Sequence, residues 1–412
     1  VLRKSAERID SCLADLVNKG FVTYEELVES ANRDRLEFYE SQSKNTCAHV
    51  KFEIDQKLVL TRQAFRGTLT VDNSSKTKLT DVSLNVTATD MLGRIATSHE
   101  MQINFESIEG FEGEVGGPWT LDAGKTGKAT VLFIPTKYAA PDTLTTYAFG
   151  GTLYFNDGND LQARDLYPVK LQVKPSPELD LTYFMQRDVY GDNPLTDDVV
   201  EPVIPAEFTV LIHNKGNGQA DNVRMFTKQP KIVDNEKGLL VDFAIVGSSL
   251  NGKDHAMALD STIVTQFGDI PAGGSSYATW DLTASLLGHF TSYDVSYSHV
   301  TSYGNPDLTL LDRVTIHELI HSVNAYVGDK LYRAWVTNDY EDGHSEPDHI
   351  YLSNGTDEDL TTLHDVAEMT RIDSAHYSLT VTATQRGWYY TKVTNPGGAH
   401  NKILSIRNVT AN

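Results

Sequence analysis

The sequence predicts a mainly β protein made of tandem antiparallel β-sandwich domains, with an N-terminal α-helical hairpin. Three observations support this fold class. In residues 204–226, apolar and polar residues alternate, a polar glycine-rich turn follows at 214–218, and β-leaning residues then resume, which is the pattern of strand, turn and strand. A related pattern occurs once upstream. Helical periodicity is confined to residues 1–44.

Length and charge limit the number of domains and the partners. A chain of 412 residues is expected to form about two to four domains. A net charge of −21 predicts repulsion from nucleic acid and from anionic membrane surfaces. No run approaches the ~20 consecutive apolar residues of a membrane helix, so we expect no membrane insertion. The chain begins without a leader and stops in mid-pattern, which is typical of a piece of a longer protein.

Residues 1–44 are expected to form the helical hairpin. A first helix would end at Lys19-Gly20, because glycine supplies the left-handed cap. Thr23 would begin a second helix, with Glu26 completing a capping box. We expect the hairpin to cap the next module or to be the tail of a preceding helical region.

Cys12 and Cys47 are the only cysteines. Two cysteines do not make a disulfide framework, and their separation fits no zinc pattern. Two alternatives are consistent with the sequence: a single disulfide between the hairpin and the first sandwich, or two free buried thiols.

The rest of the chain divides into three β-rich parts. We expect a first sandwich at residues 45–175, a second at 176–325, and a third, truncated β-rich module at 326–412. The boundary between the sandwiches falls at Lys174-Pro175-Ser176-Pro177, where prolines stiffen a short extended linker. A stiff linker favours a rod over a flexible string.

The two sandwiches are predicted to be copies of one unit. Asn73 aligns with Asn214, and Asp81-Val82 aligns with Asn222-Val223. Farther along, residues 121–124 correspond to 270–273, and residues 147–157 to 293–303. Landmarks in one order and at similar separations indicate an internal repeat.

Residues 208–223, followed by Ile270-Pro271-Ala272-Gly273, resemble the Ig-like modules of the cell-adhesion-related domain family of bacteria (CARDB). The first copy resembles them less closely, because Asn73-Ser74-Ser75 lacks the glycines of the turn. The resemblance covers about residues 47–325. It implies tandem Ig-like sandwiches in long, secreted or surface-displayed bacterial proteins, with no catalytic residues to carry over.

One motif indicates chemistry instead. His317-Glu318-Leu319-Ile320-His321 is an HExxH sequence, in which two histidines one helical turn apart bind zinc and the glutamate acts as general base on the zinc-bound water. This interpretation makes the protein a zinc metallopeptidase, with His317 and His321 as metal ligands and Glu318 as the catalytic base.

Three arguments favour a structural role for the motif. Residues 310–326 are rich in β-branched residues and lie at a domain boundary, which predicts an extended segment rather than a helix. No second helix presents a third ligand from His344, Glu346 or Asp348. The region upstream repeats as sandwich strands rather than the mixed sheet and helices of a protease.

Three acidic turns, at residues 156–160, 188–192 and 339–348, carry the oxygen ligands that calcium prefers. None has the offsets of the twelve-residue calcium loop, and Asn, Asp and Gly are ordinary turn residues. We therefore expect no cofactor, with zinc and calcium as alternatives.

The combined expectation is a non-catalytic scaffold or adhesion segment of an extracellular or cell-surface protein. Its partners would be a protein or glycan at a surface, or neighbouring modules of the same chain, met through loops or unpaired edge strands. The alternatives are the zinc metallopeptidase and a carbohydrate-binding module. We expect Trp280 and Trp388 in cores, and Trp119 and Tyr190, near turns, in contact with a partner.

Overall fold

The computed structural model describes residues 50–61, 64–158, 160–166, 168–192, 200–228, 231–235, 243–255, 262–289, 294–297, 308–338, 346–364, 367–383, 385–396 and 403–407. Within these ranges the chain forms β-strands and no α-helix, which confirms the mainly β fold class. The helical hairpin at 1–44, Cys12 and Cys47 lie outside the described residues, so nothing in the structure supports the hairpin.

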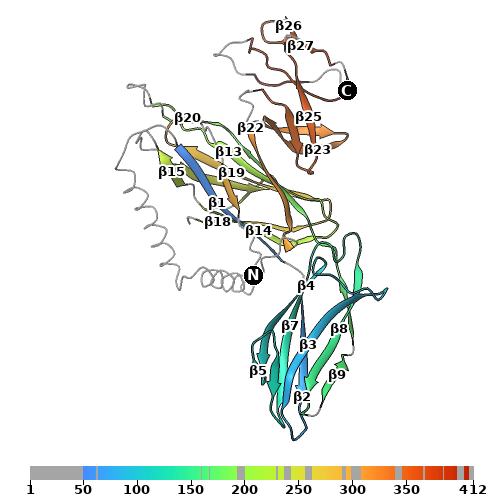
Figure 1. Ribbon diagram of the computed structural model, residues 1–412. Helices are drawn as coiled ribbons and strands as arrows, with labels where there is room; N and C mark the ends of the chain where they lie inside the picture. The colour runs from blue at the N-terminus through green and yellow to red at the C-terminus, as the bar shows by residue number, and fades with distance from the viewer. Residues whose placement is uncertain are drawn as a thin grey trace, which may run out of the picture.

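Figure 1 shows three strand-rich bodies arranged along one direction, with the first sandwich at one end. The first sandwich comprises β2 (Phe65–Asp72), β3 (Leu79–Asp90), β4 (Met101–Glu109), β5 (Glu112–Gly113), β6 (Trp119–Leu121), β7 (Thr126–Pro135), β8 (Thr145–Asn156), β9 (Leu161–Asp165) and β10 (Val169–Val173). The second sandwich comprises β1 (Val50–Thr61), β11 (Leu179–Met185), β12 (Asp188–Val189), β13 (Ala206–Asn214), β14 (Ala220–Lys228), β15 (Lys231–Asn235), β16 (Phe243–Leu250), β17 (Lys253–His255), β18 (Thr262–Ile270), β19 (Ser275–Ala284), β20 (Gly288–His289) and β21 (Asp294–Tyr297).

The second sandwich is joined to the third module by one long strand, β22 (Leu311–Val327). The third module continues with β23 (Lys330–Asn338), β24 (His349–Leu352), β25 (Asp357–Thr362), β26 (Ala367–Arg371), β27 (Tyr377–Val381) and β28 (Trp388–Tyr390). Its small apolar cluster lies on one face of the sheet and includes Ala334, Ile350 and Leu352.

Two sheets pack face to face in the first sandwich. One has the order β2-β7-β4, and the other has the order β10-β8-β3-β6-β5 with β9 also paired to β8. Alternate residues of each sheet point inward, so that Val131 and Phe133 of β7 meet Ala88 of β3 and Phe149 of β8. Trp119 lies in the same interior and is fully buried. The described residues thus form the antiparallel sandwich that the sequence predicted.

The second sandwich repeats this packing between two other sheets. Its larger sheet runs β17-β16-β19-β13-β11 and then continues through β22, while the facing sheet has the order β15-β1-β14-β18. Val210 and Trp280 from the larger sheet pack against Val223 and Met225 of β14 in one core. This core contains Trp280, as the alternation of its strand predicted.

The strand β1 precedes the first sandwich along the chain but pairs inside the second. It is antiparallel to β14 and β15 and parallel to β21. The sequence boundary at residues 45–175 assigned this segment to the first sandwich. Its hydrogen-bond partners lie instead between Ala220 and Tyr297, so the first sandwich is assembled from β2 onward.

The two positions aligned in the sequence make the same hydrogen bonds. Asn73, just after β2, and Asn214, the last residue of β13, are both buried. Each side-chain amide donates to the carbonyl four residues on and to two carbonyls of the facing loop. The acceptors of Asn73 are Thr77 (2.9 Å), Leu121 (3.1 Å) and Asp122 (3.1 Å); those of Asn214 are Gly218 (2.8 Å), Ile270 (3.1 Å) and Pro271 (3.1 Å). Downstream, Asp81 (φ 52°) and Asn222 (φ 54°) share a left-handed conformation.

Candidate functional site

The HExxH segment lies in the middle of β22, a strand of 17 residues. β22 pairs in parallel with β11 and antiparallel with β23, with an irregularity between Leu319 and His321. An HExxH zinc site needs both histidines on one side of a helical turn. The extended backbone of β22 does not provide that geometry, as its β-branched composition predicted.

His317 is part of an aromatic cluster. Its Nε2 lies 3.1 Å from the hydroxyl of Tyr351, and the two ring centroids are 4.9 Å apart. The ring of Phe184, from β11, lies 6.3 Å from the imidazole. His317 is therefore held between two strands by neighbours that are not metal ligands.

Glu318 is buried, with 7% of its surface exposed, and its carboxylate is paired. Arg187 Nη2 lies 3.0 Å from Glu318 Oε2, and Asn338 Nδ2 lies 3.5 Å from the same oxygen. A buried carboxylate needs such a partner because desolvation penalises an isolated charge. The geometry gives Glu318 a place in an ion pair that connects β22 to the end of β11.

His321 has a third set of neighbours. It is exposed, and its Nε2 lies 3.4 Å from the hydroxyl of Tyr390 on β28. Downstream, Glu346 pairs with His364 at 3.2 Å and Asp348 with His349 at 3.4 Å, while His344 lies outside the described residues. Among the described residues, no cluster of three or more His, Cys, Asp or Glu side chains is arranged to hold a metal ion.

The motif instead belongs to a junction built on the second face of the ten-stranded sheet. Adjacent residues of β11 point to opposite faces, so Tyr183 enters the sandwich core while Phe184 enters this other cluster. Phe184 stacks on Trp335 of the third module, with ring centroids 4.9 Å apart and planes 9° apart. Leu319 of β22 is buried in the same cluster, which is sealed between the two modules.

A single carboxylate completes this junction. Glu207, on β13 of the second sandwich, accepts hydrogen bonds from three groups beyond it: Ser322 Oγ (2.7 Å), Arg333 Nη2 (3.1 Å) and Trp335 Nε1 (3.3 Å). Across the sheet, burial and then the charges of Glu207 and Asp254 raise the pKa of Asp281. Sequence reasoning missed Glu207, because its partners lie more than 100 residues away.

The junction between the two sandwiches is built from the proline linker and two loops. Lys137 Nζ contacts Glu178 at 2.7 Å, and this hydrogen bond raises the pKa of Lys137. Asn217 Nδ2 donates to the carbonyl of Pro141 at 3.0 Å. Leu308 is buried against Leu132 and Ile134, on the outer face of β7.

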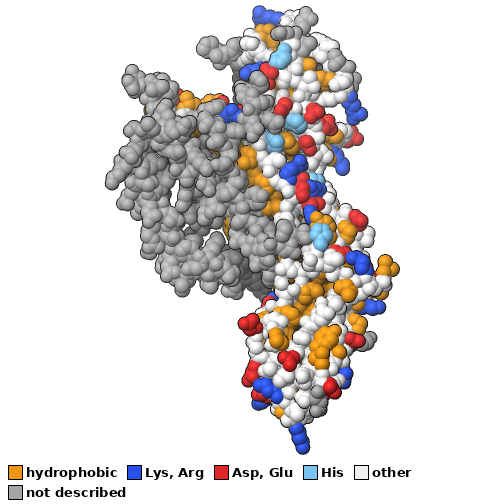
Figure 2. Space-filling view, viewed as in Figure 1, with side chains coloured by type: hydrophobic (Ala, Val, Ile, Leu, Met, Phe, Trp, Pro, Cys, Tyr) orange, Lys and Arg blue, Asp and Glu red, His pale blue; other side chains and the backbone are white. Residues whose placement is uncertain are grey.

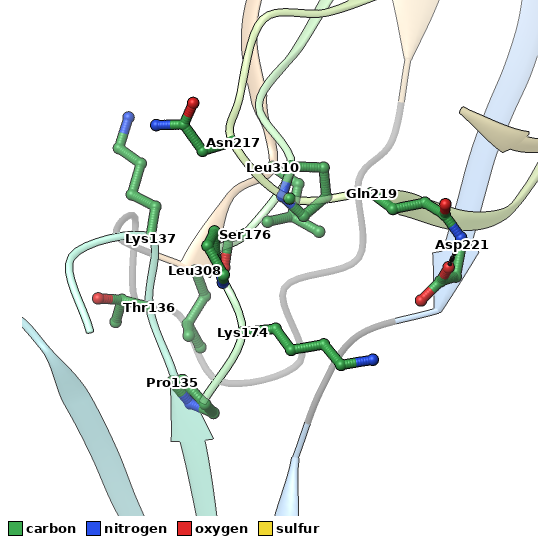
Figure 3. Close-up of a pocket in the computed structure, with 13 residues that line it drawn as sticks. Pro135, Thr136, Lys137, Lys174, Ser176, Asn217, Gln219, Asp221, Leu308 and Leu310 are labelled. Atoms are coloured by element: carbon green, nitrogen blue, oxygen red, sulfur yellow. Dashed lines mark hydrogen bonds between the residues drawn. The ribbon is translucent and has the colours of Figure 1, made fainter. Parts of the chain in front are cut away.

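Figure 3 shows the cavity that remains at this junction. Its volume is about 450 Å³, and it is lined by linker residues together with the ends of both sandwiches. Leu308 and Leu310 supply part of its apolar wall, while Lys174 and Asp221 lie at one side (Figure 3).

The aromatic residues expected at a partner surface divide into two cases. Trp119 is fully buried, stacks on Phe111 at 5.0 Å and donates from Nε1 to the carbonyl of Glu114 at 2.7 Å, so its assignment to partner contact was wrong. Proximity to a turn misled that assignment, because β6 turns its alternate side chains into the core. Tyr190 is 48% exposed. Trp388, which was expected in a core rather than at a partner surface, is half-buried beside the third module's cluster.

The acidic segment at 156–160 has the contacts of an ordinary turn, whereas Asp188–Val189 form the strand β12. Asn156 Oδ1 accepts from the amide of Gly158 at 2.8 Å, and Asp157 Oδ1 accepts from the amide of Asp160 at 3.3 Å. Asp192 accepts from the amide of Glu201 at 3.2 Å. Most of the turn at 339–348 lies outside the described residues.

Comparison with known proteins leaves the family open. No family model and no curated protein matches the chain. Among solved structures, the secreted serine protease VesC from Vibrio cholerae is 10% identical, with a TM-score of 0.16; the match covers 63% of this chain and 53% of that one. Two structures of BcpA, the major pilin subunit of Bacillus cereus, are 10–11% identical, with TM-scores of 0.16 and 0.18, and cover 65% of this chain and 70% of theirs. Similarity this low supports no inference about function.

No helix with the length and apolarity to cross a membrane occurs in the part of the chain that the structure describes.

Proposed function

We propose that this chain is a non-catalytic scaffold segment of an extracellular or cell-surface protein, and that it holds binding regions at fixed spacing. The observation that carries the proposal is β22, which is shared by the sheet of the second sandwich and by the sheet of the third module. A hinge between modules needs an irregular segment that can change its backbone angles. Residues 311–318 of β22 pair with β11 and residues 318–327 pair with β23, so one continuous strand crosses from the second sandwich into the third module. Over the described residues 311–327, a continuous strand leaves no irregular segment of that kind at the boundary.

Side chains reinforce this shared strand. The stacked pair Phe184–Trp335 and the hydrogen bonds to Glu207 add buried contacts across the same boundary. Relative motion of the two modules would expose Trp335, which is fully buried, and would remove the three hydrogen bonds that Glu207 accepts from Ser322, Arg333 and Trp335. Both changes cost free energy, since buried apolar surface and buried polar groups would each lose their partners.

The segment also presents apolar contact surface. Figure 2 shows hydrophobic side chains gathered on the visible face of the first sandwich. Large hydrophobic side chains that are exposed on this sandwich are Met91, Leu92, Ile95, Val115, Tyr138, Leu144, Leu161 and Val169. Apolar surface of this kind is a common feature of protein interaction sites. The Ig-like, CARDB-type family and the surface location belong to the same proposal, on the sequence resemblance given above.

Rigidity is the property to test first. Small-angle X-ray scattering gives the longest dimension of the particle, and 15N relaxation gives the rotational correlation time of each module. We expect the second sandwich and the third module to share one correlation time. Separate, shorter correlation times for these two parts would refute the spacer function.

Zinc content tests the metallopeptidase alternative directly. We expect purified protein to hold well under one zinc per chain, with no difference between wild type and His321→Ala. Because His321 is exposed, this substitution leaves the fold intact. Stoichiometric zinc that is lost in His321→Ala would favour the peptidase and overturn the proposed function.

A further inference from the structure

The strand β2 is an open edge of the first sandwich. Its sheet has the order β2-β7-β4, and β7 is its strand partner among the described residues. In the second sandwich the equivalent strand, β13, lies between β19 and β11. The equivalence rests on Asn73 and Asn214, which lie at the ends of the two strands and make the same hydrogen bonds.

Burial at aligned positions differs because of this missing neighbour. Val210 and Ile212 of β13 are fully buried, whereas the aligned Leu69 and Val71 of β2 are only half-buried against their core. The aligned side chains have similar size and apolarity, so the difference lies in what covers them. The core of the first sandwich is therefore accessible along β2.

The backbone of β2 faces outward at alternate residues. The amide of Asn73 donates to the carbonyl of Lys125 at 2.9 Å, which extends the pairing of β2 with β7. Antiparallel pairs alternate, so the peptide groups of Thr68 and Thr70 point away from β7, toward the open edge. Both threonines are exposed. An edge of this kind is a template for another strand.

We infer that the open edge of β2 is a docking site for an extended segment of a partner protein, which adds to the sheet antiparallel to β2. The second sandwich specifies the chemistry of that segment, because β11 fills the equivalent position. β11 has seven residues, and those that face the core are apolar and nearly fully buried: Leu179, Leu181, Tyr183 and Met185. The partner segment is expected to alternate in the same way.

On the face away from the core, β11 carries Asp180, Thr182 and Phe184, so this face of the partner segment is not restricted to one residue type. Thr68 and Thr70 of β2 flank the edge on that face. Backbone hydrogen bonds supply affinity in this mode of recognition, and pockets for alternate side chains supply specificity.

This docking site would be a specific contact surface of the proposed scaffold. The inference rests on the proposed function only for that role, and not for the binding itself. Scattering and relaxation test the rigidity of the chain without involving β2. Peptide binding tests the edge without involving β22. The two can therefore fail separately.

The experiment is a fluorescence-anisotropy titration of a labelled synthetic peptide of residues 178–186 with the full chain. We expect saturable binding to wild type and to Thr70→Ala, which keeps the backbone amide. Thr70→Pro removes that amide and places a ring at the edge, and we expect binding at least ~10-fold weaker. Proline is tolerated at an edge position of this kind, and circular dichroism checks the fold. A scrambled peptide is the control for non-specific binding.

Amide hydrogen exchange supplies the second measurement. We expect the amides of Thr68 and Thr70 to exchange fast in the chain alone and to become protected when the peptide is added. Protection in the chain alone would mean that the chain already covers this edge, and would overturn the inference. So would the absence of saturable binding, or equal binding by Thr70→Ala and Thr70→Pro.

Discussion

The two sandwiches share a folding device but differ at one edge of the sheet. In both, a buried asparagine at the end of a strand ties a turn to the facing loop: Asn73 after β2 and Asn214 in β13. The sheet of the first sandwich stops at β2, whereas that of the second continues through β11 and β22 into the third module. Among the described residues, the same unit thus has an open edge strand in the first sandwich, whereas in the second sandwich further strands are added at the equivalent edge.

The largest effect is expected where the second sandwich meets the third module. Trp335→Ala removes a fully buried indole that stacks on Phe184, and should destabilise this part of the chain by about 3–5 kcal/mol. Urea unfolding followed by fluorescence should split into separate transitions for the two modules. Tyr326→Ala, 70% exposed on β22, is the control and should change stability little. An unsplit transition in Trp335→Ala would show that the extended edge does not couple the modules.

The shared asparagine should give the next largest effect, and a similar one in each sandwich. Asn73→Ala and Asn214→Ala each leave buried carbonyls without donors, at a cost of about 2–4 kcal/mol. Each variant should shift the unfolding transition of its own sandwich in urea. Ser74→Ala, at an exposed neighbouring position, is the control. A loss of stability in Asn214→Ala but not in Asn73→Ala would show that the two asparagines do not have the same role in the two sandwiches.

Substitutions at Glu318 test whether its carboxylate has a structural role in β22. Glu318→Gln removes the negative charge that pairs with the guanidinium of Arg187. We expect a loss of about 2 kcal/mol in the free energy of unfolding. Arg187→Met should cost a similar amount, and the double variant less than the sum of the two. A double-mutant cycle in urea measures this coupling. Full additivity of the two substitutions would contradict the ion pair.

The pH dependence should have opposite signs in the two sandwiches. In the first, the hydrogen bond from Arg94 lowers the pKa of Glu100 from 4.5 to about 2. A lowered pKa contributes stability that is present above the unfolded value and is lost as the pH falls from 4.5 toward 2. Because Arg94 is more than half exposed, solvent screening limits this contribution to about 1 kcal/mol.

In the second sandwich, burial raises the pKa of Asp281, so ionisation above its ordinary value of 3.8 costs stability there. Acidification from neutral pH should therefore recover some stability in the second sandwich as Asp281 is protonated. Glu100→Gln should reduce the loss of unfolding free energy that the first sandwich shows at low pH. Asp281→Asn should reduce the gain of unfolding free energy that the second sandwich shows on acidification. Denaturant titrations at pH 2.5 to 7 would measure both; slopes of one sign in the two sandwiches would refute the contrast.

Several features of the fold were predictable from local pattern. The alternation in residues 204–226 placed β13 and β14, and the alignment of Asn73 with Asn214 identified positions that make the same hydrogen bonds. β-branched residues around the HExxH motif predicted that it would be extended, and it lies in β22. These features depend on neighbours in sequence, which the sequence displays directly.

The sequence by itself determined where strands form, since the alternation of apolar residues needs only a nearby core to favour an extended chain. The tertiary structure alone decided which strands pair: β1 with β14 rather than β2, and β22 with both β11 and β23. Backbone hydrogen bonds between strands are the same for nearly every residue type, so an edge accepts many strands. The choice among them is made by side chains far apart in the sequence, such as Glu207 and Arg333 or Phe184 and Trp335, which meet only after the chain has folded.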